Sequence, residues 1–221
     1  MKKSSSKKSP LNSGDARPKK RKPQRYRPQN PPKLRCFFGI RFTLTKEIEA
    51  INTALSEQTG EVADKLRLVP QNNLHVTLKF LGSVEESSLQ TLESILREAA
   101  ARHTPFELKV TGTGYFKNSC WVGIEEQESL SRLAEELNTA ASALGVLSES
   151  KAYVPHVTVA RFGKSKTDIK SQIKPILDRF DDEAWGTISV DKICLYRSDT
   201  LSEGARYTVI SEAKLTDTKS N

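Results

Sequence analysis

The phrase HVTLKFLG at residues 75–82 is repeated as HVTVARFG at residues 156–163, and the two copies contain two of the chain's three histidines. Polar and apolar residues alternate in both copies, which indicates half-buried β-strands. On a strand, side chains two residues apart share a face, so His75 lies beside Thr77 and His156 beside Thr158. Each strand therefore offers an imidazole and a hydroxyl to the same side.

Two such strands facing each other would place two imidazoles and two hydroxyls in one cavity. Histidine titrates near neutral pH, so a neutral ring can take a proton from an attacking water while a protonated ring delivers one to a leaving oxygen. The threonine hydroxyls would donate to the non-bridging oxygens of a phosphate. Lys79, on the His75 face by strict alternation, would add positive charge. This chemistry needs neither a metal nor a cofactor.

Two other kinds of site are less well supported. A zinc site wants three or four ligands, and we find no carboxylate or thiol suited to complete one beside either phrase. A serine triad lacks a G-x-S-x-G stretch. The third histidine, His103, follows a helical pattern and precedes a Thr-Pro pair, so we interpret it as structural.

The three cysteines, Cys36, Cys120 and Cys194, are odd in number, far apart and without C-x-x-C spacing. They lie in apolar runs, where a free cysteine behaves as a small buried hydrophobe. We expect a reducing compartment and no disulfide framework. A catalytic thiol is the less favoured alternative.

The elements around the phrases are also duplicated. The runs CFFGI (36–40) and CWVGI (120–124) read as buried strands that precede the two histidines by 39 and 36 residues. Between strand and histidine, and again after each histidine phrase, apolar residues recur at helical spacing. These four helical patterns centre on Ile48–Leu55, Leu89–Ala99, Leu130–Leu144 and Ile169–Leu177, the last with Thr167 as its expected N-cap.

Two strand candidates follow at 187–196 and 206–215. We therefore predict an α+β fold of two lobes related by an approximate two-fold axis. It has two antiparallel-rich sheets with helices outside and a central cleft that carries both histidine strands. The predicted domain spans 35–215, with a short C-terminal tail at 216–221.

The N-terminal segment 1–34 has twelve Lys/Arg and one acid, a net charge of +11, whereas the rest of the chain has a net charge of −3. It is nearly free of apolar residues, so we expect a disordered basic tail. It would serve either as an arm for RNA, with Tyr26 stacking on a base, or as a solubilising extension. PKKRK at 18–22 has the form of a nuclear localisation signal, relevant only in a eukaryote.

No stretch reaches the roughly 20 apolar residues of a membrane span, and no apolar core follows the N-terminal lysines. We therefore expect a cytoplasmic protein without a membrane partner, or a nuclear one if the source is a eukaryote.

At this level the chain resembles the two-histidine phosphoesterase superfamily, and within it the RNA 2′,3′-cyclic phosphodiesterases, also called 2′-5′ RNA ligases. The resemblance covers about residues 35–215 and rests on the paired H-x-T-x motifs with their flanking segments. These are RCFFGIRF (35–42), NLHVTLKFLG (73–82), GYFKNSCWVGI (114–124), YVPHVTVARF (153–162) and LYRSDTLSEGARYTVI (195–210).

The resemblance implies hydrolysis of a terminal RNA 2′,3′-cyclic phosphate to a 2′-phosphomonoester, or the reverse 2′-5′ ligation, by a monomer whose partner is RNA. It implies His156 as proton acceptor, His75 as proton donor, and Thr77, Thr158 and Arg161 as phosphate-binding residues. Strict alternation, however, places Arg161 on the face opposite His156. It would reach the cleft through a bulge or from the strand end, or else serve as an ion-pair partner.

The chain departs from the family where many members have an arginine before the second buried strand, because Lys117-Asn118-Ser119 stands there. Two alternatives to RNA cyclic phosphodiesterase activity stay open. One is a phosphodiesterase for another 2′-5′ or cyclic nucleotide, such as 2′-5′ oligoadenylates. The other is a non-catalytic RNA-binding module.

Overall fold

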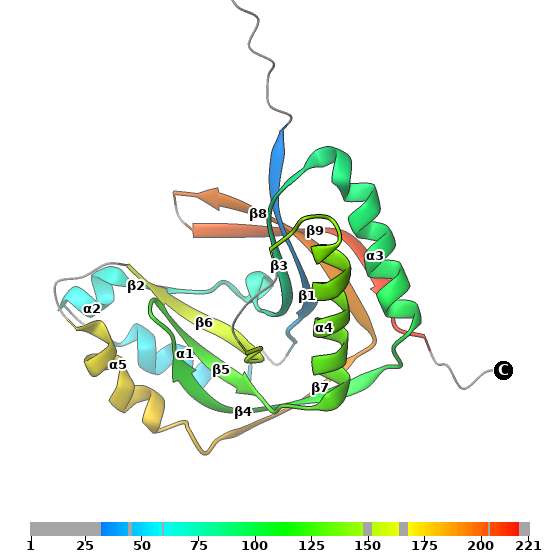
Figure 1. Cartoon of the computed structure of the whole chain (residues 1–221). Coiled ribbons are helices and arrows are strands. Elements are labelled where there is room, and N and C mark those ends of the chain that lie inside the picture. The colour runs from blue at the N-terminus through cyan, green and yellow to red at the C-terminus, as the bar shows by residue number, and fades with distance from the viewer. Residues whose placement is uncertain are drawn as a thin grey trace, which may run out of the picture. The chain divides into compact units, whose positions relative to one another are not determined.

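The computed structural model describes residues 32–43, 46–58, 60–147, 152–163, 168–202 and 204–216. Within them, nine strands form one antiparallel sheet in the order β7-β4-β5-β6-β3-β1-β8-β9, with β2 beside β6 (Figure 1). The predicted α+β class is confirmed. The two predicted sheets are the two halves of this sheet, because β6 and β3 are joined through the pair Val76–Val157.

The half-sheet that contains the second histidine phrase is built from five strands. They are β2 (Leu66–Leu68), β4 (Phe106–Tyr115), β5 (Ser119–Ile124), β6 (His156–Phe162) and β7 (Ala184–Val190). The half-sheet of the first phrase is built from β1 (Lys33–Arg41), β3 (His75–Glu85), β8 (Lys192–Leu201) and β9 (Gly204–Lys214). In both halves the histidine strand lies next to the strand of its Cys-aromatic partner phrase.

Two helices of the described chain, α1 (Glu49–Ser56) and α4 (Glu128–Ser142), are exchanged between the halves. The other described helices are α2 (Gly60–Lys65), α3 (Leu89–Ala101) and α5 (Ile169–Asp178), with 3-10 turns η1 (Gln71–Asn73) and η2 (Glu86–Ser88). The second-half helix α4 packs with α3 against strands of the first half, and α1 packs with α5 and β2 (Figure 1). This exchange makes the two lobes interdependent parts of one domain.

The apolar faces of both histidine strands pack into the core. Val76 and Val157 are fully buried in the main cluster with Leu96 of α3 and Leu137 of α4. His75 and His156 point to the other face, because neighbouring side chains on a strand alternate. Helix burial therefore fixes which side of the sheet is left for chemistry.

The expected strand at 187–196 is wrong as a single element. It is interrupted at Asp191, so β7 lies at one end of the strand order and β8 near the other. Since one residue joins them, the sheet must curl until its two ends approach each other. The apolar pattern of residues 187–196 does not indicate that β7 and β8 pair with different strands.

Both histidine strands carry a bulge at the same place in the repeated phrase. On β3, Thr77 and Lys79 face consecutive residues of β1, so Leu78 is the extra residue. On β6, Thr158 and Ala160 face consecutive residues of β5, so Val159 is extra. A bulge of this kind reverses the in-out alternation for the residues that follow it.

The bulge overturns the prediction for Lys79. Its side chain is 1% exposed, away from the histidine face, and its Nζ donates to the carbonyl of Leu147 at 2.8 Å. Phe80 takes the place on the histidine face instead. Strict alternation fails here because it assumes a regular strand.

Several expectations concern segments outside the described residues. These are the basic tail to residue 31, the Thr167 cap and residues 217–221. The first described residue of α5 is preceded by Asp168 at the N-cap position. None of the described helices is both long and apolar enough to cross a membrane.

Candidate active site

A cavity of about 240 Å³ opens on the histidine face where β3 and β6 meet. It brings together all five residues that the sequence singles out as a site: His75, Thr77, His156, Thr158 and Arg161. The two phrases, 81 residues apart in the chain, thus line one chamber. Its remaining lining residues are Phe80, Phe116 and Ser119.

Both imidazoles are anchored in the same way. His75 Nδ1 lies 2.7 Å from the carbonyl oxygen of Asn73, and His156 Nδ1 lies 2.7 Å from that of Val154. A carbonyl oxygen only accepts, so each Nδ1 must carry the hydrogen. In each ring this leaves Nε2 as the nitrogen that can exchange a proton. The repeated sequence therefore produces a repeated tautomer.

The surroundings of both histidines favour the neutral imidazole. Burial, followed by the nearby charges of Arg161 and His156, lowers the pKa of His75 from its ordinary value of 6.5 to about 4. Burial and then Arg161 lower the pKa of His156 as well. Desolvation penalises the imidazolium form, and a cation close by adds to the penalty. A negative charge beside either ring would act in the opposite direction and raise its pKa.

Aromatic rings fix the position of each imidazole. The ring of Phe37 lies 4.6 Å from that of His75, and Tyr207 meets His75 edge-on at 5.0 Å between centroids. His156 has Phe116 edge-on at 4.8 Å and Trp121 at 6.1 Å. Phe37 and Trp121 directly follow the cysteine in the two Cys-aromatic phrases. Each of these phrases therefore places an aromatic ring beside the histidine of its own half.

The hydroxyls in the cavity are available to a ligand. None of the hydrogen bonds among the described residues engages the side-chain oxygen of Thr77, Thr158 or Ser119. The backbone of Thr77 is held in place, since its carbonyl accepts a hydrogen bond from Tyr153 Oη at 2.9 Å. These hydroxyls can therefore donate to the oxygens of a phosphate without first breaking a bond within the described structure.

Arg161 reaches the cavity because of the bulge at Val159. Val159 and Ala160 are both buried in succession, and the alternation then resumes with Arg161 outward on the histidine face. Of the alternatives that the sequence leaves open, the structure shows the bulge. Among the described residues no carboxylate lies within ion-pair distance of Arg161 or lines this cavity.

Three lining residues escaped the sequence reasoning. Phe80 occupies the same place in its phrase as Arg161 does in the other, so an alignment of the two repeats with one shared bulge would have found it. Ser119 belongs to the Lys117-Asn118-Ser119 stretch before the second buried strand, and sequence reasoning assigned no role to its hydroxyl. Phe116 comes from the same turn and carried no separate signal.

The other candidates lie away from the cavity. His103 contacts the Glu136 carboxylate through Nε2 at 2.8 Å, which agrees with a structural role. The three cysteines are buried and free, and burial raises the pKa of each thiol to about 11 or 12, the opposite of what activates a nucleophilic cysteine. In the described parts of the chain, no group of three or more His, Cys, Asp or Glu is arranged to hold a metal ion.

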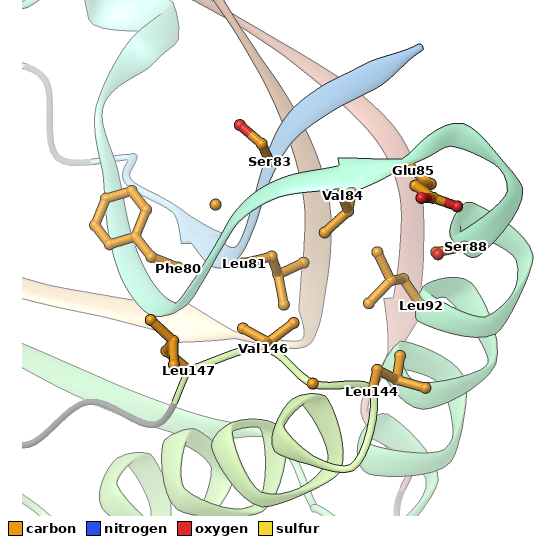
Figure 2. Close-up of a pocket in the computed structure, with 12 residues that line it drawn as sticks. Phe80, Leu81, Ser83, Val84, Glu85, Ser88, Leu92, Leu144, Val146 and Leu147 are labelled. Carbon is orange, nitrogen blue, oxygen red and sulfur yellow. The ribbon is translucent and has the colours of Figure 1, made fainter. Parts of the chain in front are cut away.

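On the Phe80 side, the cavity is followed by a mostly apolar hollow of about 720 Å³ between β3 and the end of α4, whose lining also includes Ser83, Glu85 and Ser88. Figure 2 shows Leu81, Val84 and Leu92 across from Leu144 and Val146, with Phe80 and Leu147 at one end. The Arg161 side opens instead into a groove with a basic lining. The two flanks of the cavity thus differ in character although the repeats that form it are alike.

Comparison with known proteins gives a consistent family. An RNA 2′,3′-cyclic phosphodiesterase of Aquifex aeolicus is 30% identical over 188 residues, covering 81% of this chain and 96% of the relative. One of Methanothermobacter thermautotrophicus is 28% identical over 183 residues, covering 80% and 96%.

Solved structures show the same fold. Escherichia coli LigT, crystallised with 3′-AMP, superposes with a TM-score of 0.66 at 24% identity, covering 84% of this chain and 100% of that one. TT0787 of Thermus thermophilus gives 0.66 at 24%, covering 82% and 98%. The sequence profile of the 2′-5′ RNA ligase superfamily matches residues 43–201. This chain is a member of the 2′-5′ RNA ligase superfamily.

Proposed function

We propose that this protein is a phosphodiesterase that opens a 2′,3′-cyclic phosphate at an RNA end to a 2′-phosphomonoester, without a metal ion. The relatives named RNA 2′,3′-cyclic phosphodiesterase support this choice of substrate. The observation that carries the mechanism is the pair of imidazoles in one cavity, whose lining has no carboxylate among the described residues. Each has Nδ1–H bound to a main-chain carbonyl and Nε2 available for proton transfer.

In the proposed step, Nε2 of His156 takes a proton from water as the water oxygen forms a bond to phosphorus. The bond from phosphorus to the 3′ oxygen breaks, its electron pair stays on that oxygen, and His75 supplies the proton from Nε2. Each such acid or base contributes about 10²- to 10⁴-fold in rate. The direction, with His75 as acid, comes from the family resemblance, since the two anchored rings are equivalent in geometry.

The remaining lining groups would bind the phosphate. The hydroxyls of Thr77 and Thr158 would donate to its two non-bridging oxygens, and the Arg161 guanidinium would balance its negative charge. The same negative charge would raise the low pKa of His75 when substrate binds. The proton donor is thereby prepared only in the occupied site.

Ligation would be the same step with the 5′-hydroxyl of a second RNA in place of water. Nε2 of His156 would take the proton of that hydroxyl as its oxygen bonds to phosphorus. The bond to the 3′ oxygen would break, and His75 would protonate that oxygen, which leaves a 2′-5′ phosphodiester. The family's description as 2′-5′ RNA ligases favours this second activity. Which of the two reactions dominates would depend on the concentration of RNA with a 5′-hydroxyl.

The test is turnover of an oligoribonucleotide ending in a 2′,3′-cyclic phosphate, in EDTA, with the position of the product phosphate identified. We expect a 2′-phosphate, and a loss of at least about 10²-fold in His75→Ala and in His156→Ala. His103→Gln, which changes the histidine outside the cavity, serves as the matched control and should keep its rate. A 2′-5′-linked oligoadenylate in the same assay tests the alternative substrate.

Three results would contradict the proposal. One is turnover that stops in EDTA and returns with a divalent metal. Another is equal activity of both histidine variants and wild type. The third is tight RNA binding without turnover of any of these substrates, which would favour the RNA-binding module.

A further inference from the structure

A second groove of about 460 Å³ adjoins the catalytic cavity and shares Arg161 with it. One wall is the segment from β2 through η1, including Arg67, and the other is the end of the β8–β9 hairpin, including Arg206. No described carboxylate lines this groove. Its size lies within the range of small-ligand sites.

The two arginines nearest the cavity lie directly across from each other. Arg67 of β2 is paired with Arg161 of β6, and the side chains of both are exposed. Like charges directly opposite each other destabilise a sheet. Arg67 donates through Nη1 only to the carbonyls of Asp64 and Leu66, so no carboxylate of the described chain neutralises this pair. Such a pair is well suited to an anion with more than one charge.

The third arginine is only partly neutralised. Arg206 Nη2 lies 3.7 Å from Asp199 Oδ2, while the other oxygen of that carboxylate accepts from Arg197 Nε at 2.8 Å. One carboxylate is thus shared by two guanidinium groups, which leaves positive charge at the hairpin end of the groove.

One residue, Asn73, connects the hairpin wall of the groove to His75. The buried side chain of Asn73 donates from Nδ2 to the Ala205 carbonyl at 2.6 Å and accepts from the Tyr207 backbone N–H at 3.2 Å, which fastens the hairpin wall. The carbonyl of the same Asn73 accepts Nδ1–H of His75. A ligand group on this wall therefore has a fixed distance to the reacting atoms.

The two flanks of the cavity give the substrate a direction. Phe80 and Arg161 hold equivalent positions in the repeated phrase. Phe80 lies next to the mostly apolar hollow, whose lining contains the carboxylate Glu85, and Arg161 lies next to the arginine groove. An RNA with a terminal cyclic phosphate continues only on its 5′ side, and each continuing nucleotide brings a phosphodiester charge. The positively charged flank, next to the arginine groove, is therefore the one that suits the 5′ continuation of the RNA.

We infer that the groove is a subsite for the nucleotide on the 5′ side of the cyclic-phosphate residue, in which Arg67 and Arg206 bind its phosphodiester. Leu68, Val69, Pro70 and Leu201, which also line the groove, offer apolar surface to its sugar and base. This inference rests on the proposed function and extends it, because it makes the enzyme selective for oligonucleotides over cyclic mononucleotides.

The test compares two substrates in the full-length protein. One is a tetraribonucleotide ending in a 2′,3′-cyclic phosphate, and the other is 2′,3′-cyclic AMP, which has no upstream phosphodiester. In Arg67→Ala and in Arg206→Ala we expect the ratio of kcat/KM for the tetranucleotide to kcat/KM for cyclic AMP to fall about tenfold, since a charged phosphate contact is lost. Arg67→Lys should recover part of this ratio.

Arg132→Ala is the matched control, because Arg132 is an exposed arginine on α4 whose ion-pair partner among the described residues is Glu128. It should leave the ratio at the wild-type value. The salt dependence gives a second readout: the slope of log kcat/KM against log salt for the tetranucleotide should be about 0.7 shallower per arginine removed.

An unchanged ratio in both arginine variants, with wild-type turnover of both substrates, would overturn the subsite and leave the proposed function intact. An equal loss on both substrates would also overturn it, since it would place the arginines in the cyclic-phosphate site or in the fold. Absence of turnover of either substrate by the wild type would instead contradict the proposed function.

Discussion

Val76 of β3 is paired with Val157 of β6 in antiparallel register, at the junction of the two half-sheets. Because neighbouring strand residues alternate in face, this pair buries its own side chains in the core and turns the residues on either side outward. The antiparallel direction sets His75 on the side of Thr158 and Thr77 on the side of His156. One pair thus merges two separate H-x-T phrases into a single two-fold-like site.

The low pKa values predict an acidic optimum for the free enzyme. The productive state has one proton on the histidine pair, and both pKa values lie below 6.5, that of His75 at about 4. The profile of kcat/KM should therefore be bell-shaped, peak below pH 6.5 and fall as pH rises. The profile of kcat should peak at higher pH, since the bound phosphate raises both pKa values. Coinciding maxima, or kcat/KM that is flat up to pH 8, would contradict this account.

The roles of the two histidines can be separated through the leaving group. A thiolate leaves without a proton, so a cyclic substrate with sulfur in place of the 3′ oxygen no longer needs a general acid. His75→Ala should recover most of its lost rate on this substrate, whereas His156→Ala should stay about 10²-fold or more below wild type. Single-turnover rates on the oxygen and sulfur substrates measure the difference. Recovery in the other variant would exchange the assigned roles.

Lys79 and Arg161 are predicted to differ in their effect on activity. Replacing Arg161 with Met removes a cation from the cavity and should lower kcat/KM by about 10- to 100-fold, the range expected for a hydrogen bond to a charged group. Lys79→Met changes a side chain that points away from the cavity and should stay within about twofold of wild type. Steady-state kinetics on both variants, with circular dichroism to check folding, decide the matter. A large loss in Lys79→Met with an intact fold would restore the role that the sequence suggested.

Gly39 is predicted to be essential for the close approach of β1 to β3. A Cβ at this position would lie 2.8 Å from the carbonyl oxygen of Val76, a backbone atom that cannot easily move. Gly39→Ala should therefore lower the free energy of unfolding by about 1–3 kcal/mol, as overpacking does. Gly163→Ala, where a Cβ meets nothing described within 4 Å, should change it by less than about 0.5 kcal/mol. Urea denaturation of both variants measures this, and equal midpoints would refute it.

The candidate site residues could be predicted from the sequence because the phrase that contains them occurs twice in the chain. Paired H-x-T phrases named both imidazoles and both threonines, and the repeated Cys-aromatic runs located the strands beside them. The helices of the described chain followed from apolar spacing, since burial of one face imposes the same period wherever the helix packs. These features depend on the spacing of residues along the chain, which can be read directly from the sequence.

Tertiary structure decided what local spacing does not contain. The matching bulges at Leu78 and Val159 moved Lys79 out of the cavity and brought Phe80 and Arg161 in, because a single extra residue reverses every later side chain on the strand. The change of strand partner at Asp191 and the facing of Arg67 by Arg161 depend on which strands meet. Strand pairing is set by the packing of the whole core, so the sequence identified the candidate site residues while the fold determined their surroundings.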